Sequence, residues 1–263
     1  MMNALWSAAA GMAVQQDNMD TISNNLANVN TTAFKRGRAE FQDLLYQTIN
    51  LAGTNSSTNT TLPAGIQLGH GAKLQSVVTD YSVGNLQQTG GRFDLAIEGD
   101  GFFAVTMPDG TLAYTRDGSF STDQNGNLVN AEGYTVSPQI TIPQDALSVT
   151  VGSDGTVSVT EPGQTQPQQV GQITLSHFMN NAGLNQIGQN LVQPTLASGD
   201  AITGNPGTDG MGTINQGFLE ASNVDVASEM VNMIIGQRAY EANSKTIETV
   251  NAMLSLLNQL KQQ

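Results

Sequence analysis

The chain contains no cysteine among its 263 residues, which excludes both a disulfide framework and a thiolate metal centre. Charged residues make up only 12% of the chain and aromatic residues only 5%. Much of the surface must therefore consist of Asn, Gln, Ser, Thr and Gly. Such a surface suits close packing between subunits, because a buried unpaired charge costs free energy whereas amides and hydroxyls can find hydrogen-bond partners.

Positive charge is also scarce, since 9 Lys and Arg stand against 22 Asp and Glu and give a net charge of −13. Nucleic acids and anionic membranes bind basic surfaces, so we expect neither as a partner. Apolar runs stay well below the roughly 18 residues that a membrane-spanning helix needs. The first 14 residues lack the basic segment of a secretory signal peptide. We expect no membrane insertion, and export without a cleaved signal peptide if the protein leaves the cytoplasm.

Catalytic and metal-binding motifs are not evident. The two histidines, His70 and His177, lie far apart and lack the spacing of metal ligands or of a nucleophile and its base. The segment 99–101 (Gly-Asp-Gly) lacks the third glycine of a dinucleotide-binding loop, and Asp123 starts an incomplete calcium-loop pattern. Both are better explained as turns. The sequence therefore predicts no catalytic residue, no metal and no cofactor, and a protein that is not an enzyme.

Both ends of the chain carry apolar residues that repeat every seven positions. This spacing predicts one narrow apolar seam on each of two long helices, and such a seam is stable only against a partner helix. The partner is either the other terminal helix or another copy of the chain. Trp6, the sole tryptophan, lies beside the first seam and is either an intersubunit anchor or an edge residue of the helix pair. The first seam comprises Leu5, Ala8, Met12, Met19, Ile22, Leu26 and Val29; the second comprises Met233, Tyr240, Asn243, Ile247, Val250, Leu254 and Leu257.

Helix limits follow from local chemistry. The first helix is expected to run from about residue 3 to the Asn-rich segment near residue 28, because Asn side chains compete for backbone hydrogen bonds. The second is expected to begin near Ser222 or Asn223 as its cap, with Asp225 and Glu229 placed favourably in the helix dipole. About 35 residues without proline follow, which is typical of a coiled coil.

Between the helices, alternating apolar residues and turn motifs predict short antiparallel strands. Val149 and Val151 precede the segment 152–155 (Gly-Ser-Asp-Gly) and Val157 and Val159 follow it, as in a β-hairpin. We therefore predict an α+β protein with a coiled-coil domain (1–30 and 222–263), an extended connecting segment (31–70) and an antiparallel β domain (71–221), arranged as a sandwich or barrel.

One basic cluster, Lys35, Arg36 and Arg38, interrupts the acidic sequence. It either contacts the acidic surface of a neighbouring copy or forms an ordinary solvated turn. Exposed ion pairs contribute only about 0–1 kcal/mol each, so the energy of such contacts does not separate the two interpretations.

Several motifs resemble the bacterial flagellar rod and hook family over nearly the whole chain. They are Ile22-Ser-Asn-Asn-Leu-Ala-Asn-Val-Asn-Thr31 near the start, Glu98-Gly-Asp-Gly-Phe-Phe103 and Tyr114-Thr-Arg-Asp-Gly-Ser-Phe120 in the centre, and Ser222-Asn-Val-Asp-Val226 with Gln237-Arg-Ala-Tyr-Glu-Ala-Asn243 near the end. Hook proteins usually carry a further outer domain for which this chain has no room. The resemblance therefore favours a rod subunit over a hook subunit.

The resemblance implies a structural subunit of the distal rod, which polymerises into a rigid hollow drive shaft that transmits torque and carries the export channel. Its implied partners are other copies of the chain, proximal rod proteins, the hook protein, the surrounding L and P ring proteins and the flagellar type III export apparatus. The segment from about Tyr46 to Pro63 resembles an insertion that braces neighbouring rod subunits. The alternatives are a proximal rod or hook-type axial protein, or a surface adhesin with a coiled-coil stalk.

Overall fold

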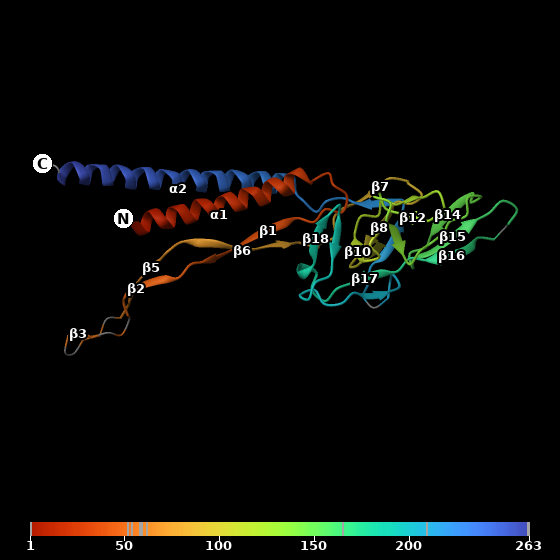
Figure 1. Ribbon diagram of the computed structural model, residues 1–263, viewed down its shortest axis with the longest axis horizontal. Coiled ribbons are helices and arrows are strands. Elements are labelled where there is room, and N and C mark those ends of the chain that lie inside the picture. The colour runs from red at the N-terminus through yellow and green to blue at the C-terminus, as the bar shows by residue number, and fades with distance from the viewer. Residues whose placement is uncertain are drawn as a thin grey trace. The chain divides into compact units, whose positions relative to one another are not determined.

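The computed structural model describes residues 2–51, 53, 55–57, 60–61, 63–164, 166–208 and 210–261. Contacts within the chain group it into two units (Figure 1). Residues 1–27, 37–78 and 225–263 form the first, called here the helical unit, and residues 28–36 and 79–224 form the second, called the β unit. The predicted domain boundaries stay predictions, because grouping by contacts does not test which segments fold independently.

Two long helices, α1 (Met2–Ala27) and α2 (Val226–Lys261), dominate the helical unit and lie side by side in Figure 1. Their contacts run in opposite order along the two helices. A Cβ on Gly11 would meet Asn243, and one on Gly236 would meet Met19. The helices are therefore antiparallel, and the prediction of one long helix at each end of the chain is confirmed.

The start of α2 corrects the predicted cap. Asp225 accepts hydrogen bonds from the backbone N–H of Ala227 (3.2 Å) and from the hydroxyl of Ser228 (2.6 Å), so Asp225 is the capping residue. Ser222 and Asn223 do not cap the helix. The amide of Asn223 is instead bonded to the backbone of two other segments of the β unit.

A two-stranded antiparallel ribbon completes the helical unit. The first strand pairs with the last, and the inner strands pair with each other in turn: β1 with β6, β2 with β5, and β3 with β4. Strand β1 contacts α1, and Ser7 of α1 bonds the backbone oxygen of Gly69 (3.4 Å). Parts of the low-complexity segment 52–62 lie outside the described residues. The strands are β1 (Gly37–Asp43), β2 (Tyr46–Asn50), β3 (Asn55–Ser57), β4 (Thr60–Thr61), β5 (Ile66–Gly69) and β6 (Ala72–Thr79).

The β unit is built from short antiparallel strands. A nine-stranded sheet has the order β11-β12-β13-β9-β10-β19-β18, with β17 also pairing β9 and β20. Three further sheets are β14-β15-β16, β21-β8 and β22-β7. The predicted hairpin is confirmed, because Val149 lies opposite Val159 and Val151 opposite Val157.

The bounds of these elements follow the short spacing of the turn motifs. The strands are β7 (Leu86–Gln88), β8 (Leu95–Glu98), β9 (Phe102–Thr106), β10 (Leu112–Thr115), β11 (Ser121–Thr122), β12 (Leu128–Val129), β13 (Thr135–Ser137), β14 (Ser148–Val151), β15 (Thr156–Thr160), β16 (Gln168–Gln172), β17 (Leu175–His177), β18 (Asn185–Gly188), β19 (Leu191–Gln193), β20 (Ile202–Gly204), β21 (Thr213–Gln216) and β22 (Phe218–Glu220). One 3-10 turn, η1, spans Asn181–Gly183.

The β unit has a continuous core of its own. Leu95, Ile97, Phe103 and Val105 are fully buried at its centre, together with residues from the other sheets of the unit. A smaller cluster contains Phe102, which packs edge-on against Phe178. Together with the terminal helices, this mostly antiparallel region confirms the α+β fold class.

Candidate assembly surface and buried ion network

The predicted seams face the interior of the helical unit only in part. On α1, Ala8 and Ile22 are buried, and Leu5, Met12, Met19 and Leu26 are half-buried. On α2, Val250 is buried, and Met233, Ile247 and Leu254 are half-buried. Val29 follows the end of α1 and lies in the β unit, where it is half-buried. Tyr240, Leu257 and Trp6 are exposed, and Trp6 keeps 68% of its surface accessible. Contacts of these residues with another copy stay a prediction.

The last part of α2 extends beyond the start of α1. The antiparallel pairing sets Gly11 against Asn243 and Met19 against Gly236, so each step along α1 moves one step back along α2. Extrapolated to Met2, this register reaches about residue 252 of α2. Residues 253–261 therefore have no facing residue on α1 within the described part of the chain. Four large apolar side chains in this overhang are exposed: Met253, Leu256, Leu257 and Leu260.

Apolar side chains are exposed elsewhere in the helical unit as well. They lie on the first half of α2 and on both strands of the ribbon. Apolar residues scattered singly over a protein surface would need no explanation. Here they follow single elements, which is typical of surfaces that contact another molecule. They are Val226, Met230, Val231, Ile234 and Ile235 on α2, and Phe41, Leu45, Tyr46, Ile49, Leu51, Ile66, Leu68 and Val77 on or beside the ribbon.

A buried asparagine joins three elements of the helical unit. The Asn25 side chain of α1 donates to the backbone oxygen of Gly37 (2.8 Å) and accepts from its N–H (2.9 Å). Its amide nitrogen also lies 3.4 Å from Oε2 of Glu229 on α2, and Asn25 and Glu229 are only 2% and 3% exposed. The Asn25 amide thus satisfies both backbone hydrogen-bonding groups of Gly37, the first residue of β1, in place of a neighbouring strand.

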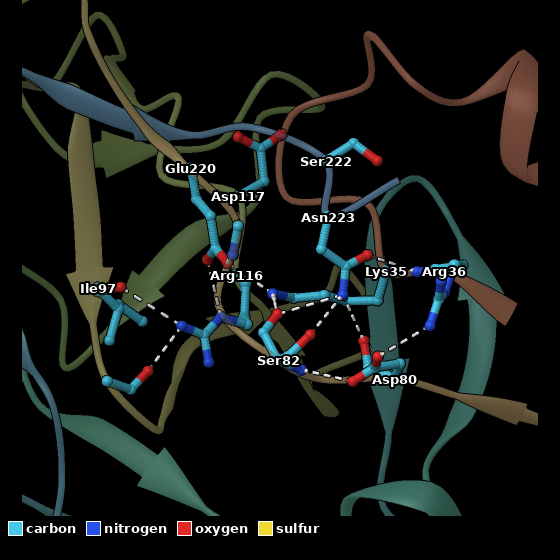
Figure 2. A network of polar contacts seen from close by, with 12 residues as sticks. Lys35, Arg36, Asp80, Ser82, Ile97, Arg116, Asp117, Glu220, Ser222 and Asn223 are labelled. Atoms are coloured by element: carbon cyan, nitrogen blue, oxygen red, sulfur yellow. Dashed lines mark hydrogen bonds and ion pairs between the residues drawn. The ribbon is translucent and has the colours of Figure 1, made fainter. Parts of the chain in front are cut away.

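The β unit contains a buried ion network centred on Glu220, the last residue of β22 (Figure 2). Lys35 Nζ lies 2.5 Å from one carboxylate oxygen, and Arg116 Nε lies 2.9 Å from the other. The backbone N–H of Gly84 donates to the first oxygen (2.7 Å). The Glu220 side chain has no exposed surface, so its charge is balanced entirely within the chain.

The two cations of the network have further acceptors. Lys35 Nζ donates to the backbone oxygen of Ser82 (2.7 Å), and an Arg116 nitrogen donates to that of Gly99 (2.7 Å). Burial lowers the pKa of Lys35 below the usual lysine value, and the nearby Arg116 charge lowers this pKa further, against the opposing effect of Glu220. Satisfied donors and close pairing are the conditions under which buried charges are tolerated.

The predicted basic cluster is divided between buried and exposed positions. Lys35 is 7% exposed and its ammonium is engaged inside the β unit. Arg36 lies 3.5 Å from Asp80, and Arg38 lies 2.8 Å from Glu40, each in a solvent-accessible pair. A role of this cluster in contacts with a neighbouring copy stays a prediction.

Sequence reasoning did not identify Glu220 or the role of Arg116. The two residues are separated by 104 positions, and Lys35 and Glu220 by 185, so no local pattern links them. A signal was nevertheless present, because Arg116 is the sole Lys or Arg between residues 93 and 224. An isolated cation in a long acidic, β-forming stretch indicates a buried partner.

Other kinds of site find no support in the part of the chain that the structure describes. Among those residues no group of three or more His, Cys, Asp or Glu could hold a metal ion. In the same range, no helix is long and apolar enough to span a bilayer.

Comparison with known proteins gives matches along most of the chain. Three family models match it: "Flagella basal body rod protein" over residues 5–35, "Flagellar hook protein FlgE/F/G D1 domain" over residues 96–159, and "Flagellar basal body rod FlgEFG protein C-terminal" over residues 215–260. Lys35, Arg116 and Glu220 each come from a different one of these three segments. These matches define the class as a structural protein of the flagellar rod and hook.

Full-length relatives narrow this class. The flagellar basal-body rod protein FlgG of Buchnera aphidicola subsp. Schizaphis graminum is 54% identical over 99% of this chain and 100% of its own length. FlgG of Borreliella burgdorferi is 52% identical over 100% of both chains, and FlgG of Caulobacter vibrioides is 50% identical over 99% of this chain and 100% of its own. The chain belongs to the FlgG family of flagellar basal-body rod proteins. It is a structural protein of the flagellum, and the prediction that it is not an enzyme is confirmed by this membership.

Proposed function

We propose that this chain is a subunit of the distal rod, which polymerises into a rigid, hollow helical shaft that transmits motor torque to the hook and encloses the export channel. The observation that carries this proposal is the overhang of α2. Its exposed Met253, Leu256, Leu257 and Leu260 continue the apolar face of a helix beyond the end of its partner. A second copy that covers this face would repeat the contact at its own overhang, and a repeated contact that does not close generates a filament.

The terminal helices are proposed to pair as a coiled coil. Positions 229, 233, 236, 240, 243, 247, 250 and 254 of α2 alternate in steps of four and three, which is the coiled-coil spacing. Among them, Gly236 and Val250 are buried and Met233 and Ile247 half-buried. In the assembled shaft this domain (1–30 and 222–263) would lie on the inside and the β domain (71–221) outside it, as the resemblance to rod and hook proteins implies.

The ribbon is proposed as the extended connecting arm that braces neighbouring subunits. Leu45, Tyr46 and Ile49 are exposed on it although each is large and apolar. A two-stranded ribbon with exposed apolar side chains is only marginally stable in water. Contact with another copy would remove those side chains from solvent.

Other copies of this chain are the first proposed partner. The proximal rod proteins below, the hook protein above and the type III export apparatus complete the axial set. The surrounding L and P rings would meet the β unit, whose only cation between residues 93 and 224 is the buried Arg116. Such an acidic exterior suits a ring lumen with basic groups. The proposed location is the basal body between periplasm and outer membrane.

Electron microscopy of the purified full chain at rising concentration tests polymerisation, with and without isolated basal bodies from a strain that lacks this chain as templates. We expect straight tubes from the full chain, and none from a variant in which Met253, Leu256, Leu257 and Leu260 are replaced by Ser. A matched control replaces the exposed Ser255 and Gln259 of the same overhang by Ala. Globular particles from the full chain in the presence of templates would overturn the proposal.

A further inference from the structure

Two segments of the β unit connect it in the chain to α1 and α2. Residues 28–36 follow α1 in the chain, and residues 217–224 precede α2. Both are held at Glu220. The first segment reaches it through Lys35 and the second contains it, as Figure 2 shows.

Glu220 bonds the first segment through both its backbone and its side chain. Its backbone oxygen accepts from the N–H of Ala33 (2.8 Å), while its carboxylate accepts from Lys35 Nζ (2.5 Å). The other carboxylate oxygen accepts from Arg116 Nε (2.9 Å), at the end of β10 in the centre of the large sheet. A single side chain therefore ties a connecting segment to the core of the unit.

A second side chain repeats this arrangement close by. The Asn223 amide accepts from the N–H of Arg36 (2.8 Å) and donates to the backbone oxygen of Asp80 (2.8 Å). Its own N–H donates to the oxygen of Phe34 (3.4 Å). The two connecting segments are thus bonded to each other as well as to the sheet.

The backbone and side chains around Glu220 are closely packed. A Cβ on Gly84 would lie 2.0 Å from the backbone oxygen of Ala221, so only glycine fits where its N–H approaches the carboxylate. The Arg116 guanidinium lies 5.9 Å from the centre of the Phe102 ring, which covers it on one side. Removing the carboxylate charge would leave two buried cations without their counter-ion.

We propose that Glu220 is a latch that holds both connecting segments on the β unit in the unassembled chain. The segments next to α1 and α2, residues 28–36 and 217–224, are then fixed on the β unit before any second copy binds. The latch depends on contacts within one chain and therefore stands or falls separately from the proposed polymerisation.

Hydrogen exchange of the full chain, measured at a concentration where it is monomeric, tests the latch. Glu220→Gln keeps the size of the side chain but removes its charge. We expect the amides of Ala33, Arg36 and Ala221 to exchange at least tenfold faster, while Leu128 in the core keeps its protection. Tenfold corresponds to about 1.4 kcal/mol of local opening free energy, well within the loss expected when one partner of a buried ion pair is removed.

Glu220→Gln could unfold the whole β unit, and Lys35→Met then provides the test of the latch. This second variant removes only the bond to the first segment, because the ion pair of Glu220 and Arg116 stays in place. It should accelerate exchange at Ala33 and Arg36 only, and leave Ala221 and Leu128 unchanged. Arg38→Met is the matched control, since Arg38 forms an exposed pair with Glu40, and it should change none of these amides. Unchanged exchange at Ala33 in Lys35→Met, or equal acceleration at Ala33 and Leu128, would overturn the proposal.

Discussion

The two units of this chain differ in how completely they bury their apolar residues. In the β unit, Phe103, Val105 and Ile214 are buried to within 1% of full burial. In the helical unit, Ile234, Ile235 and Leu260 each keep more than half of their surface exposed. A buried core stabilises a unit without a second molecule, whereas a helix with an uncovered apolar face gains stability from a partner. We therefore expect the β unit to be structured in the monomer and the helical unit to gain stability on assembly.

The largest effect is expected from a charge placed on the apolar seam of α2. Leu254→Asp should abolish assembly, because an unpaired carboxylate would be buried between subunits. The melting temperature of the β unit in the monomer should stay unchanged. Filament yield in microscopy and calorimetry of the monomer measure the two effects. Ser255→Asp, which adds the same charge at an exposed position one residue further on, serves as the control. Normal filaments and motility in Leu254→Asp would contradict the model.

The converse change attacks the core of the β unit. Phe103→Ala removes a fully buried ring that packs edge-on against Phe120, with 5.1 Å between the two ring centroids. The free energy of unfolding of the β unit should fall by about 3–5 kcal/mol, as is usual when a large core side chain is truncated. Urea denaturation followed by near-UV circular dichroism measures this loss. Leu147→Ala, at a position with 62% exposure in the same unit, should change it by less than about 0.5 kcal/mol.

A smaller loss is expected from Gly84→Ala. The added Cβ would lie 2.0 Å from the oxygen of Ala221, so the backbone beside Glu220 must shift. Overpacking of this kind lowers the free energy of unfolding by about 1–3 kcal/mol. Gly84 is not among the glycines with a positive φ, so this loss reports the close approach of the two backbones and not strain in the left-handed region. An unchanged free energy of unfolding in Gly84→Ala would show that close packing at Gly84 does not matter.

Acid should weaken the turns of the β unit. Hydrogen bonds from the backbone of Asn127 hold the pKa of Asp123 below its usual value, and bonds from Thr156 do the same for the pKa of Asp154. A carboxyl group with a lowered pKa in the folded state adds stability above its unfolded pKa, and this stability is lost as the pH falls through the folded pKa. Melting temperatures should therefore fall as the pH drops below about 4. The double substitution of Asp123 and Asp154 by Asn should make the melting temperature depend less on pH in this range. An unchanged pH dependence would contradict a contribution of these two carboxylates.

Local patterns in the sequence were sufficient for the helices and for the hairpin around Gly155, because seven-residue spacing and Asp-Gly turns act over a few residues. The cap at Asp225 was misplaced by two or three residues, because Asn223 is used by Arg36 and Asp80 from distant parts of the chain. The network at Glu220 was not predictable for the same reason. Its members are far apart in sequence, and a lysine such as Lys35 is exposed in most proteins.

Hydrogen exchange before and after assembly tests whether the helical unit needs a second copy for its stability. Amides of α1 and α2 should exchange rapidly in the monomer and become protected in the filament, while those of β9 and β10 should be protected in both states. Strong protection of α1 and α2 in the monomer, equal to that of β9 and β10, would contradict this prediction, because the helical unit would then be complete without a second copy.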